Sequence, residues 1–324
     1  MIKAVFAAAF LCTGAMAAPA PKPAAPAKPA GPSLPGQPVE LKTVDGWTLK
    51  AQFEPSTPGK LTMILLHGTG QRKEDWKRLA YPLTRAGYGV MAVDLRGHGE
   101  SRTNPAGEVL TSWKKLRATA RADNDFMDMS RDAEAAVAWL AGQGVPEDSI
   151  GFVGAEVGGS VAIRYAATHA KVPLVVMLSP GMKWQEVLTI NALRALKRPA
   201  PATPMPVLMV WSEADKTSSK EAPIMFGFAK GAVGERNATQ LVVPQERGTR
   251  MFKAQRALVG QIIDWLGSPV QPEGGPALST TAPAGGSVDP ADGSKVKDSS
   301  EKKTLIDDTG TPPPAVAPGD DNDD

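Results

Sequence analysis

Cysteine and histidine are scarce in this sequence. Its 324 residues include one cysteine, Cys12, and three histidines. A single cysteine excludes a disulfide within the chain and a zinc site built from several thiolates. An excess charge of one sign is also lacking, because 36 Lys and Arg stand against 34 Asp and Glu, for a formal net charge of +2. This balance predicts no nucleic-acid partner and no strong attraction to a membrane surface.

Long apolar runs are lacking too, so no transmembrane span is expected. The first 17 residues instead have the pattern of a signal peptide: Lys3, an apolar run over 4–13, and the small-residue site Ala15-Met16-Ala17. Cleavage there predicts export, to the periplasm or the medium. Lipoprotein anchoring through Cys12 is the alternative, which the large residue Leu11 before it disfavours.

Composition divides the rest of the chain into three parts. Residues 18–36 are nearly all Ala, Pro, Gly and Lys, which predicts an extended linker. Residues 269–324 contain no aromatic residue and close with DDNDD, which predicts a disordered acidic tail. Between them, residues 37–268 carry the pattern of one packed domain.

Apolar runs alternate with helical spacings through this domain. A hairpin is expected across Asp45-Gly46, followed by buried strands separated by helices. The expected strands are 40–44, 47–53, 61–66, 88–93, 149–153, 172–178, 207–211 and 241–243, and helices are expected near 75–86, 129–140, 158–167 and 249–266. Continuous apolar strands between helices indicate a parallel sheet buried on both faces. The sequence thus predicts a three-layer α/β fold with roughly eight mostly parallel strands and an antiparallel N-terminal hairpin.

Chemically distinctive residues follow the ends of these strands, where α/β sheets bind their ligands. The stretches are LLHGTG (65–70), DLRGHGES (94–101), GAEVGGS (154–160), WSEAD (211–215) and ERGTRMF (246–252). In this order and spacing they resemble the motifs of the α/β-hydrolase superfamily. The resemblance covers about residues 39–267 and implies a hydrolase acting on ester or related acyl bonds.

Two of the positions that the resemblance assigns to catalysis hold the wrong residue. The backbone amides of Thr69 and Val157 correspond to the oxyanion hole, and Asp215 to the acid of the triad. Glu156 stands where the family has its nucleophile, and Arg247 where it has its histidine. No histidine follows Asp215, and an arginine cannot act as a general base. The triad at Glu156, Asp215 and Arg247 is therefore read as degenerate.

The two replacements carry opposite charges, so we expect Glu156 and Arg247 to form a bidentate ion pair, with Asp215 as a second carboxylate on the same arginine. This predicts a non-catalytic protein that binds a small molecule or an envelope protein at the former active-site cleft. An active hydrolase with a rearranged site, in which Glu156 is the nucleophile, is the alternative, and a structural envelope protein without a ligand is a third. No cofactor or metal motif is found, and the oligomeric state stays open.

Overall fold

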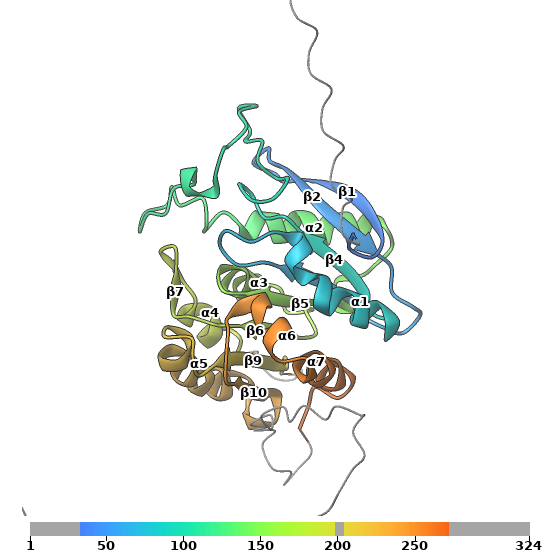
Figure 1. Cartoon of the computed structure of the whole chain (residues 1–324), viewed down its shortest axis with the longest axis vertical. Coiled ribbons are helices and arrows are strands. Elements are labelled where there is room, and N and C mark those ends of the chain that lie inside the picture. The colour runs from blue at the N-terminus through green and yellow to red at the C-terminus, as the bar shows by residue number, and fades with distance from the viewer. Residues whose placement is uncertain (1–32, 198–203, 272–324) are drawn as a thin grey trace, which may run out of the picture. The chain divides into compact units, whose positions relative to one another are not determined.

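The computed structural model describes residues 33–197 and 204–271, all within one compact unit (Figure 1). A second unit, Pro283–Asp324, lies outside the described residues. The same holds for the predicted signal peptide 1–17, for the predicted linker apart from 33–36, and for the predicted tail apart from 269–271. Among the described residues, no helix combines the length and apolar character that crossing a bilayer requires.

An eight-stranded sheet forms the centre of the domain, as the sequence predicts. Its order is β1-β2-β4-β3-β5-β6-β9-β10. Strand β2 is antiparallel to both of its neighbours, and every other pair is parallel. The strands are β1 (Gln37–Lys42), β2 (Thr48–Glu54), β3 (Thr62–Leu66), β4 (Gly89–Val93), β5 (Ile150–Ala155), β6 (Val175–Leu178), β9 (Val207–Ser212) and β10 (Ala238–Val243). The β1–β2 hairpin turns at Asp45-Gly46, where Gly46 adopts φ +91°.

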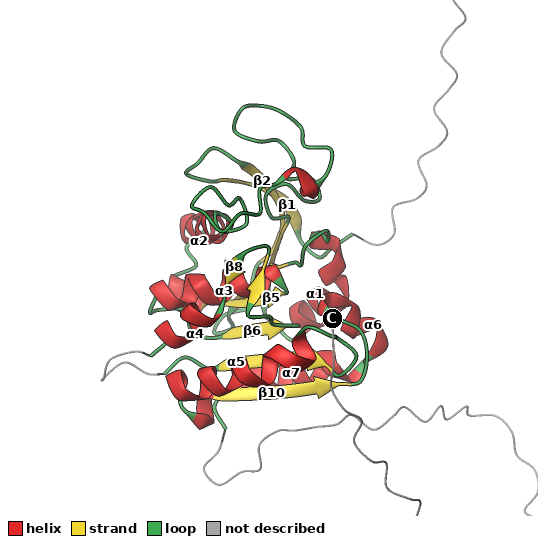
Figure 2. Ribbon diagram, turned by 90° about the vertical axis from the view of Figure 1, so that its left-hand side faces the viewer, coloured by secondary structure: helices red, strands yellow, loops and turns green. Residues whose placement is uncertain are grey.

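Helices cover both faces of the sheet and complete the three layers (Figure 2). Successive residues of β3 show why both faces are apolar, since Ile64 packs into one core cluster and Leu65 into the other. The first cluster lies under α2 (Ser130–Gly142), α3 (Val157–Thr168), α4 (Ile190–Ala195) and α5 (Ser218–Val233). The second lies under α1 (Lys77–Arg85), α6 (Met251–Ala254) and α7 (Ala257–Gly267). The predicted three-layer α/β fold, with eight mostly parallel strands and an antiparallel N-terminal hairpin, is thereby confirmed.

Local details differ from the sequence prediction for identifiable reasons. Strand β6 begins at Val175 rather than at residue 172, because Pro173 has no N–H for the ladder. The expected helix 249–266 is two helices, α6 and α7, separated at Gln255, whose φ is −124° and ψ 85°. Helix α5 was not predicted, since it contains Pro223 and two glycines that disfavour a helix interior. A small hairpin of β7 (Lys183–Trp184) and β8 (Val187–Leu188) was also missed.

The packed chain extends a few residues beyond both predicted boundaries, 37 and 268. Leu34 is buried in the second core cluster, and the Tyr81 hydroxyl donates to the carbonyl of Ser33. At the other end, the Gln271 amide donates to the carbonyl of Arg236 over 2.8 Å. These contacts join both flanking segments to the domain.

Candidate functional site

Glu156 occupies a strained turn between β5 and α3. Its backbone has φ 51° and ψ −117°, a conformation that costs a non-glycine residue on the order of 1–3 kcal/mol. Neighbouring glycines make the turn possible: a Cβ on Gly158 would lie 2.1 Å from the Leu66 carbonyl oxygen, and one on Gly154 would lie 2.3 Å from that of Gly158. The turn therefore has the sharp geometry of a nucleophile elbow, although its central residue is a glutamate.

Arg247 holds the carboxylate of Glu156 by a bidentate ion pair. Its Nε lies 2.9 Å from Oε1 and its Nη2 lies 2.8 Å from Oε2. The Glu156 residue is 4% exposed, whereas the Arg247 side chain is 36% exposed. The hydrogen bond to Glu156 raises the pKa of Arg247 above its ordinary value, so the guanidinium stays charged. The ion pair that the sequence predicts is present, between residues 91 positions apart.

The loop after β10 places Arg247 in this position. The Gly248 amide donates to Ser179 Oγ over 2.8 Å, and the Ser212 hydroxyl donates to the carbonyl of Glu246 over 2.5 Å. Gly248 has φ +52°, and a Cβ there would lie 3.2 Å from Glu156 Oε1. The small residue therefore allows the backbone to approach the glutamate closely. On its other side, the guanidinium lies over the indole ring of Trp184, 5.2 Å from the ring centroid.

Asp215 does not join this ion pair, and that part of the sequence prediction is wrong. No ion pair between Asp215 and Arg247 is found in the described part of the chain. The Oδ1 atom of Asp215 accepts the amides of Thr217 and Ser218, at 3.2 and 3.3 Å, at the start of α5. The residue is 6% exposed, and its Oδ2 atom is buried without a hydrogen-bond partner. Arg247 has instead turned the edge formed by Nε and Nη2 toward Glu156, and one edge accommodates one carboxylate.

The two predicted oxyanion amides lie on either side of the elbow. Thr69 follows β3, and Val157 is the first residue of α3; within residues 33–197 and 204–271, neither amide has an acceptor. The Glu156 carboxylate lies against this loop, because a Cβ on Gly68 would be 2.9 Å from Glu156 Cδ. Gln71 was missed in the sequence: its Oε1 accepts the Gly68 amide over 3.1 Å. The only sequence signal for Gln71 was its position just after LLHGTG.

Within the described residues, none of the three histidines forms a hydrogen bond or ion pair with Glu156 or Arg247. His67 is enclosed, with Nδ1 2.8 Å from the Gly68 carbonyl and Nε2 accepting the Leu95 amide over 3.1 Å. His98 Nδ1 lies 2.9 Å from the Arg96 carbonyl. Burial lowers the pKa of His67 to about 4 and that of His98 to about 3, so both rings are neutral at pH 7. His169 stacks on Tyr165 at the far end of α3. All three have structural contacts.

These buried histidines predict a pH dependence of stability. An imidazole whose pKa is lower in the folded than in the unfolded protein takes up its proton first on unfolding, so stability falls as pH drops below about 6.5. For His98 the fall continues to its folded pKa of about 3. Asp132, whose pKa burial raises to about 6, acts with the opposite sign.

The contribution of one histidine is therefore measured by comparing a variant of that histidine with the wild type. We expect His98→Asn to lower the slope of unfolding free energy against pH, between pH 6 and 5, by about 1.4 kcal/mol per pH unit.

Chemical denaturation at each pH measures this slope. His169→Asn is the matched control, because it makes the same exchange at a ring that lies half-buried against Tyr165 rather than in the core, and the slope of His98→Asn is compared with its slope. Equal slopes for His98→Asn and the wild type would contradict the expected neutral state of His98.

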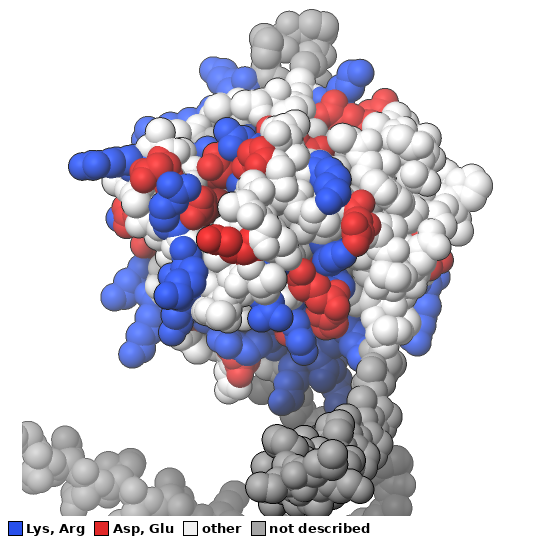
Figure 3. Space-filling view, turned by 90° about the horizontal axis from the view of Figure 1, so that it is seen from above, with Lys and Arg blue, Asp and Glu red and all other residues white. Residues whose placement is uncertain are grey.

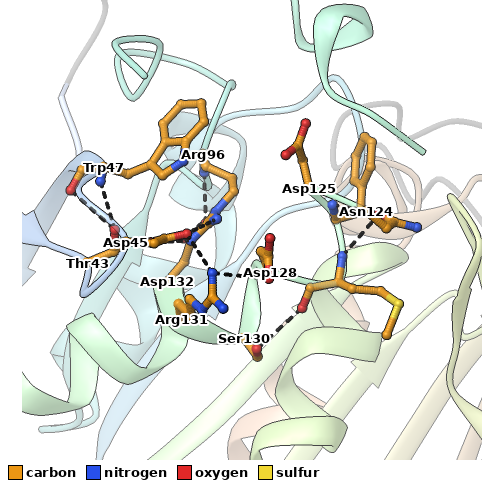
Figure 4. Close-up of polar contacts among 12 residues, drawn as sticks. Thr43, Asp45, Trp47, Arg96, Asn124, Asp125, Asp128, Ser130, Arg131 and Asp132 are labelled. Atoms are coloured by element: carbon orange, nitrogen blue, oxygen red, sulfur yellow. Dashed lines mark hydrogen bonds and ion pairs between the residues drawn. The ribbon is translucent and has the colours of Figure 1, made fainter. Parts of the chain in front are cut away.

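A cavity of about 420 Å³ lies elsewhere, and its lining includes Asp45, Trp47, Arg96 and Asp128 but none of the three triad positions. Several of its charged groups are paired: Figure 4 shows Arg96 of the lining bonded to Asp45 over 2.7 Å and to the adjoining Asp132 over 2.8 Å. On the face seen in Figure 3, acidic and basic side chains are likewise interspersed. We therefore interpret this cluster as structural support.

Comparison with known proteins agrees with the fold. The family model described as serine aminopeptidase, S33, matches residues 57–224, just over half of the chain. That range contains Glu156 and Asp215 and ends before Arg247. No curated protein matches the chain.

Solved structures resemble the domain at low sequence identity. An esterase of Pyrococcus furiosus is 20% identical with a TM-score of 0.55, over 73% of this chain and 92% of its own. A putative α/β hydrolase of Agrobacterium tumefaciens is 18% identical with a TM-score of 0.53, over 73% of this chain and 100% of its own. An esterase of Exiguobacterium antarcticum is 16% identical with a TM-score of 0.51, over 72% and 100%. These likenesses concern the fold.

Proposed function

The chain belongs to the serine aminopeptidase family S33 of the α/β hydrolases, and from this premise we propose that it is an exported protein that no longer hydrolyses substrates. Its role in this proposal is to bind a ligand, a small molecule or an envelope protein, at the place of the former triad. The bidentate contact between Glu156 and Arg247 is the observation that supports it most strongly. Both oxygens that could attack a substrate are engaged by a cation.

Covalent catalysis by Glu156 would need two further things. The carboxylate would have to leave the guanidinium, and a base would have to activate water to cleave the resulting ester. Arg247 stays protonated, and both ring nitrogens of neutral His67 are engaged by backbone groups. Neutral His98 is tied to the Arg96 carbonyl by Nδ1, and its Nε2 is buried without a hydrogen-bond partner among the described residues. An ester hydrolase with a rearranged site remains the second candidate. It is favoured by the Thr69 and Val157 amides, which have no acceptor among the described residues and are free to donate to an oxyanion.

An esterase assay separates the two candidates. The exported chain is purified, and its mass is used to check that it begins at Ala18, as the predicted cleavage requires. With p-nitrophenyl acetate we expect the wild type and Glu156→Gln to hydrolyse the ester at the same rate, equal to that of a protein without an active site. The glutamine keeps the size of the side chain and removes its charge. Turnover in the wild type that Glu156→Gln abolishes would overturn the proposal in favour of the hydrolase.

A further inference from the structure

The carboxylate of Asp215 is the one charged group at the site that its surroundings leave half satisfied. The residue is 6% exposed, and its Oδ2 atom has no hydrogen-bond partner. A buried ionised carboxylate with an unused oxygen is costly, and such groups are rare in folded proteins. The contacts of Oδ1 with Thr217 and Ser218 anchor the side chain, so Oδ2 has a defined position.

The charges around Asp215 do not cancel. Glu156 and Arg247 neutralise each other, which leaves the three positions with one negative charge in excess. The Asp215 charge contributes to the raised pKa of Arg247, so the two side chains lie within reach of each other's field, although they form no ion pair. A further positive charge placed beside Oδ2 would therefore be stabilised, and a negative one would be repelled by Asp215 and Glu156 alike.

The indole ring of Trp184, which lies beside Arg247, suits a cation with an apolar body. Trp184 presents its ring face to the Arg247 guanidinium, and ring faces of tryptophan attract cations. Arg247 is the exposed member of the ion pair, at 36%, so a shift of its side chain offers a route from solvent to the buried Asp215. An incoming ammonium group can donate to Oδ2 while its carbon chain packs against the indole.

We propose that Asp215 recognises the primary ammonium group of a ligand, and that Trp184 packs against the adjoining apolar part. This inference rests on the proposed binding function, whose ligand it assigns to the organic amines. The resemblance assigns Asp215 to the acid of the triad, and in this inference the same carboxylate anchors a ligand cation instead.

Three probes of equal shape test the inference on the full exported chain at pH 7: benzylamine as its ammonium ion, benzyl alcohol and benzoate. In calorimetry, we expect benzylammonium to bind at least about 10-fold more tightly than benzyl alcohol, because it can form a charge-assisted hydrogen bond with Asp215. Benzoate is expected not to bind. In NMR spectra, the amide signals of Thr217 and Ser218, which donate to Oδ1, should shift during the titration.

Asp215→Asn is the informative variant, because asparagine keeps an Oδ1 acceptor for both amides and removes the charge. We expect it to reduce benzylammonium affinity to that of benzyl alcohol. Asp128→Asn, in the lining of the separate 420 Å³ cavity, is the matched control and should keep the wild-type affinity. If Asp215→Asn fails to fold, the affinities of the three probes for the wild type still show whether the site selects an ammonium group.

Equal binding of benzylammonium and benzyl alcohol, or affinity unchanged in folded Asp215→Asn, would overturn the inference. Neither result affects the proposed loss of hydrolysis. Turnover of esters that depends on Glu156 would instead overturn the proposed function, whichever probe binds.

Discussion

The double variant Glu156→Ser/Arg247→His is expected to hydrolyse p-nitrophenyl acetate at least about 100-fold faster than the wild type, since a positioned base alone contributes 10²–10⁴-fold. Three features of the fold support this expectation. The turn at residue 156 has the strained elbow geometry, and the Thr69 and Val157 amides have no acceptor within residues 33–197 and 204–271. The free Oδ2 of Asp215 is a ready acceptor for the N–H of an imidazole at position 247.

Single variants provide the comparison for this gain. Glu156→Ser alone has a hydroxyl without a base, and Arg247→His alone still has the Glu156 carboxylate lying against Gly68. Both should remain near background. Adding Asp215→Asn to the double variant should remove most of the gain, because the imidazole loses its orienting carboxylate. A folded double variant that is no faster than either single variant would show that the chain has lost more than two side chains of the catalytic site.

Charge reversal at position 247 is expected to have the largest effect on stability. Arg247→Glu leaves Glu156 without its only ion-pair partner among the described residues and brings a third carboxylate toward Asp215. Removing one partner of a buried pair costs about 3–5 kcal/mol. Because Arg247 is 36% exposed, we expect Arg247→Glu to lower the free energy of unfolding by about 2–3 kcal/mol, as measured by urea denaturation.

Two further variants show whether this loss comes from the pair itself. Arg250→Glu reverses a charge three residues away, in an exposed contact with Glu246, and should cost less than about 1 kcal/mol. Glu156→Arg combined with Arg247→Glu restores opposite charges and should recover part of the stability. Recovery is only partial because a cation at position 156 meets the positive end of α3. No recovery at all would contradict a pairwise interaction between the two positions.

Several features of the protein could be predicted from local sequence because their causes are local. The elbow was recognisable since only glycine fits at positions 154 and 158, where neighbouring backbone approaches closely. The buried strands were visible as apolar runs, and the break before Val175 could have been read from Pro173. Helix α5 escaped notice because Pro223 and its glycines disfavour a helix, and packing of residues such as Met225 against the core outweighs that preference.

The sequence by itself determined the α/β-hydrolase fold, the prediction that Glu156 and Arg247 stand where the resemblance implies serine and histidine, and the opposite charges that make their pairing possible. Only the tertiary structure decided that Asp215 stays out of this ion pair. Asp215 is tied by Oδ1 to the start of α5, and the loop at Gly248 directs the guanidinium to Glu156. Side-chain orientation of this kind depends on contacts between residues far apart in the chain, which a local pattern does not contain.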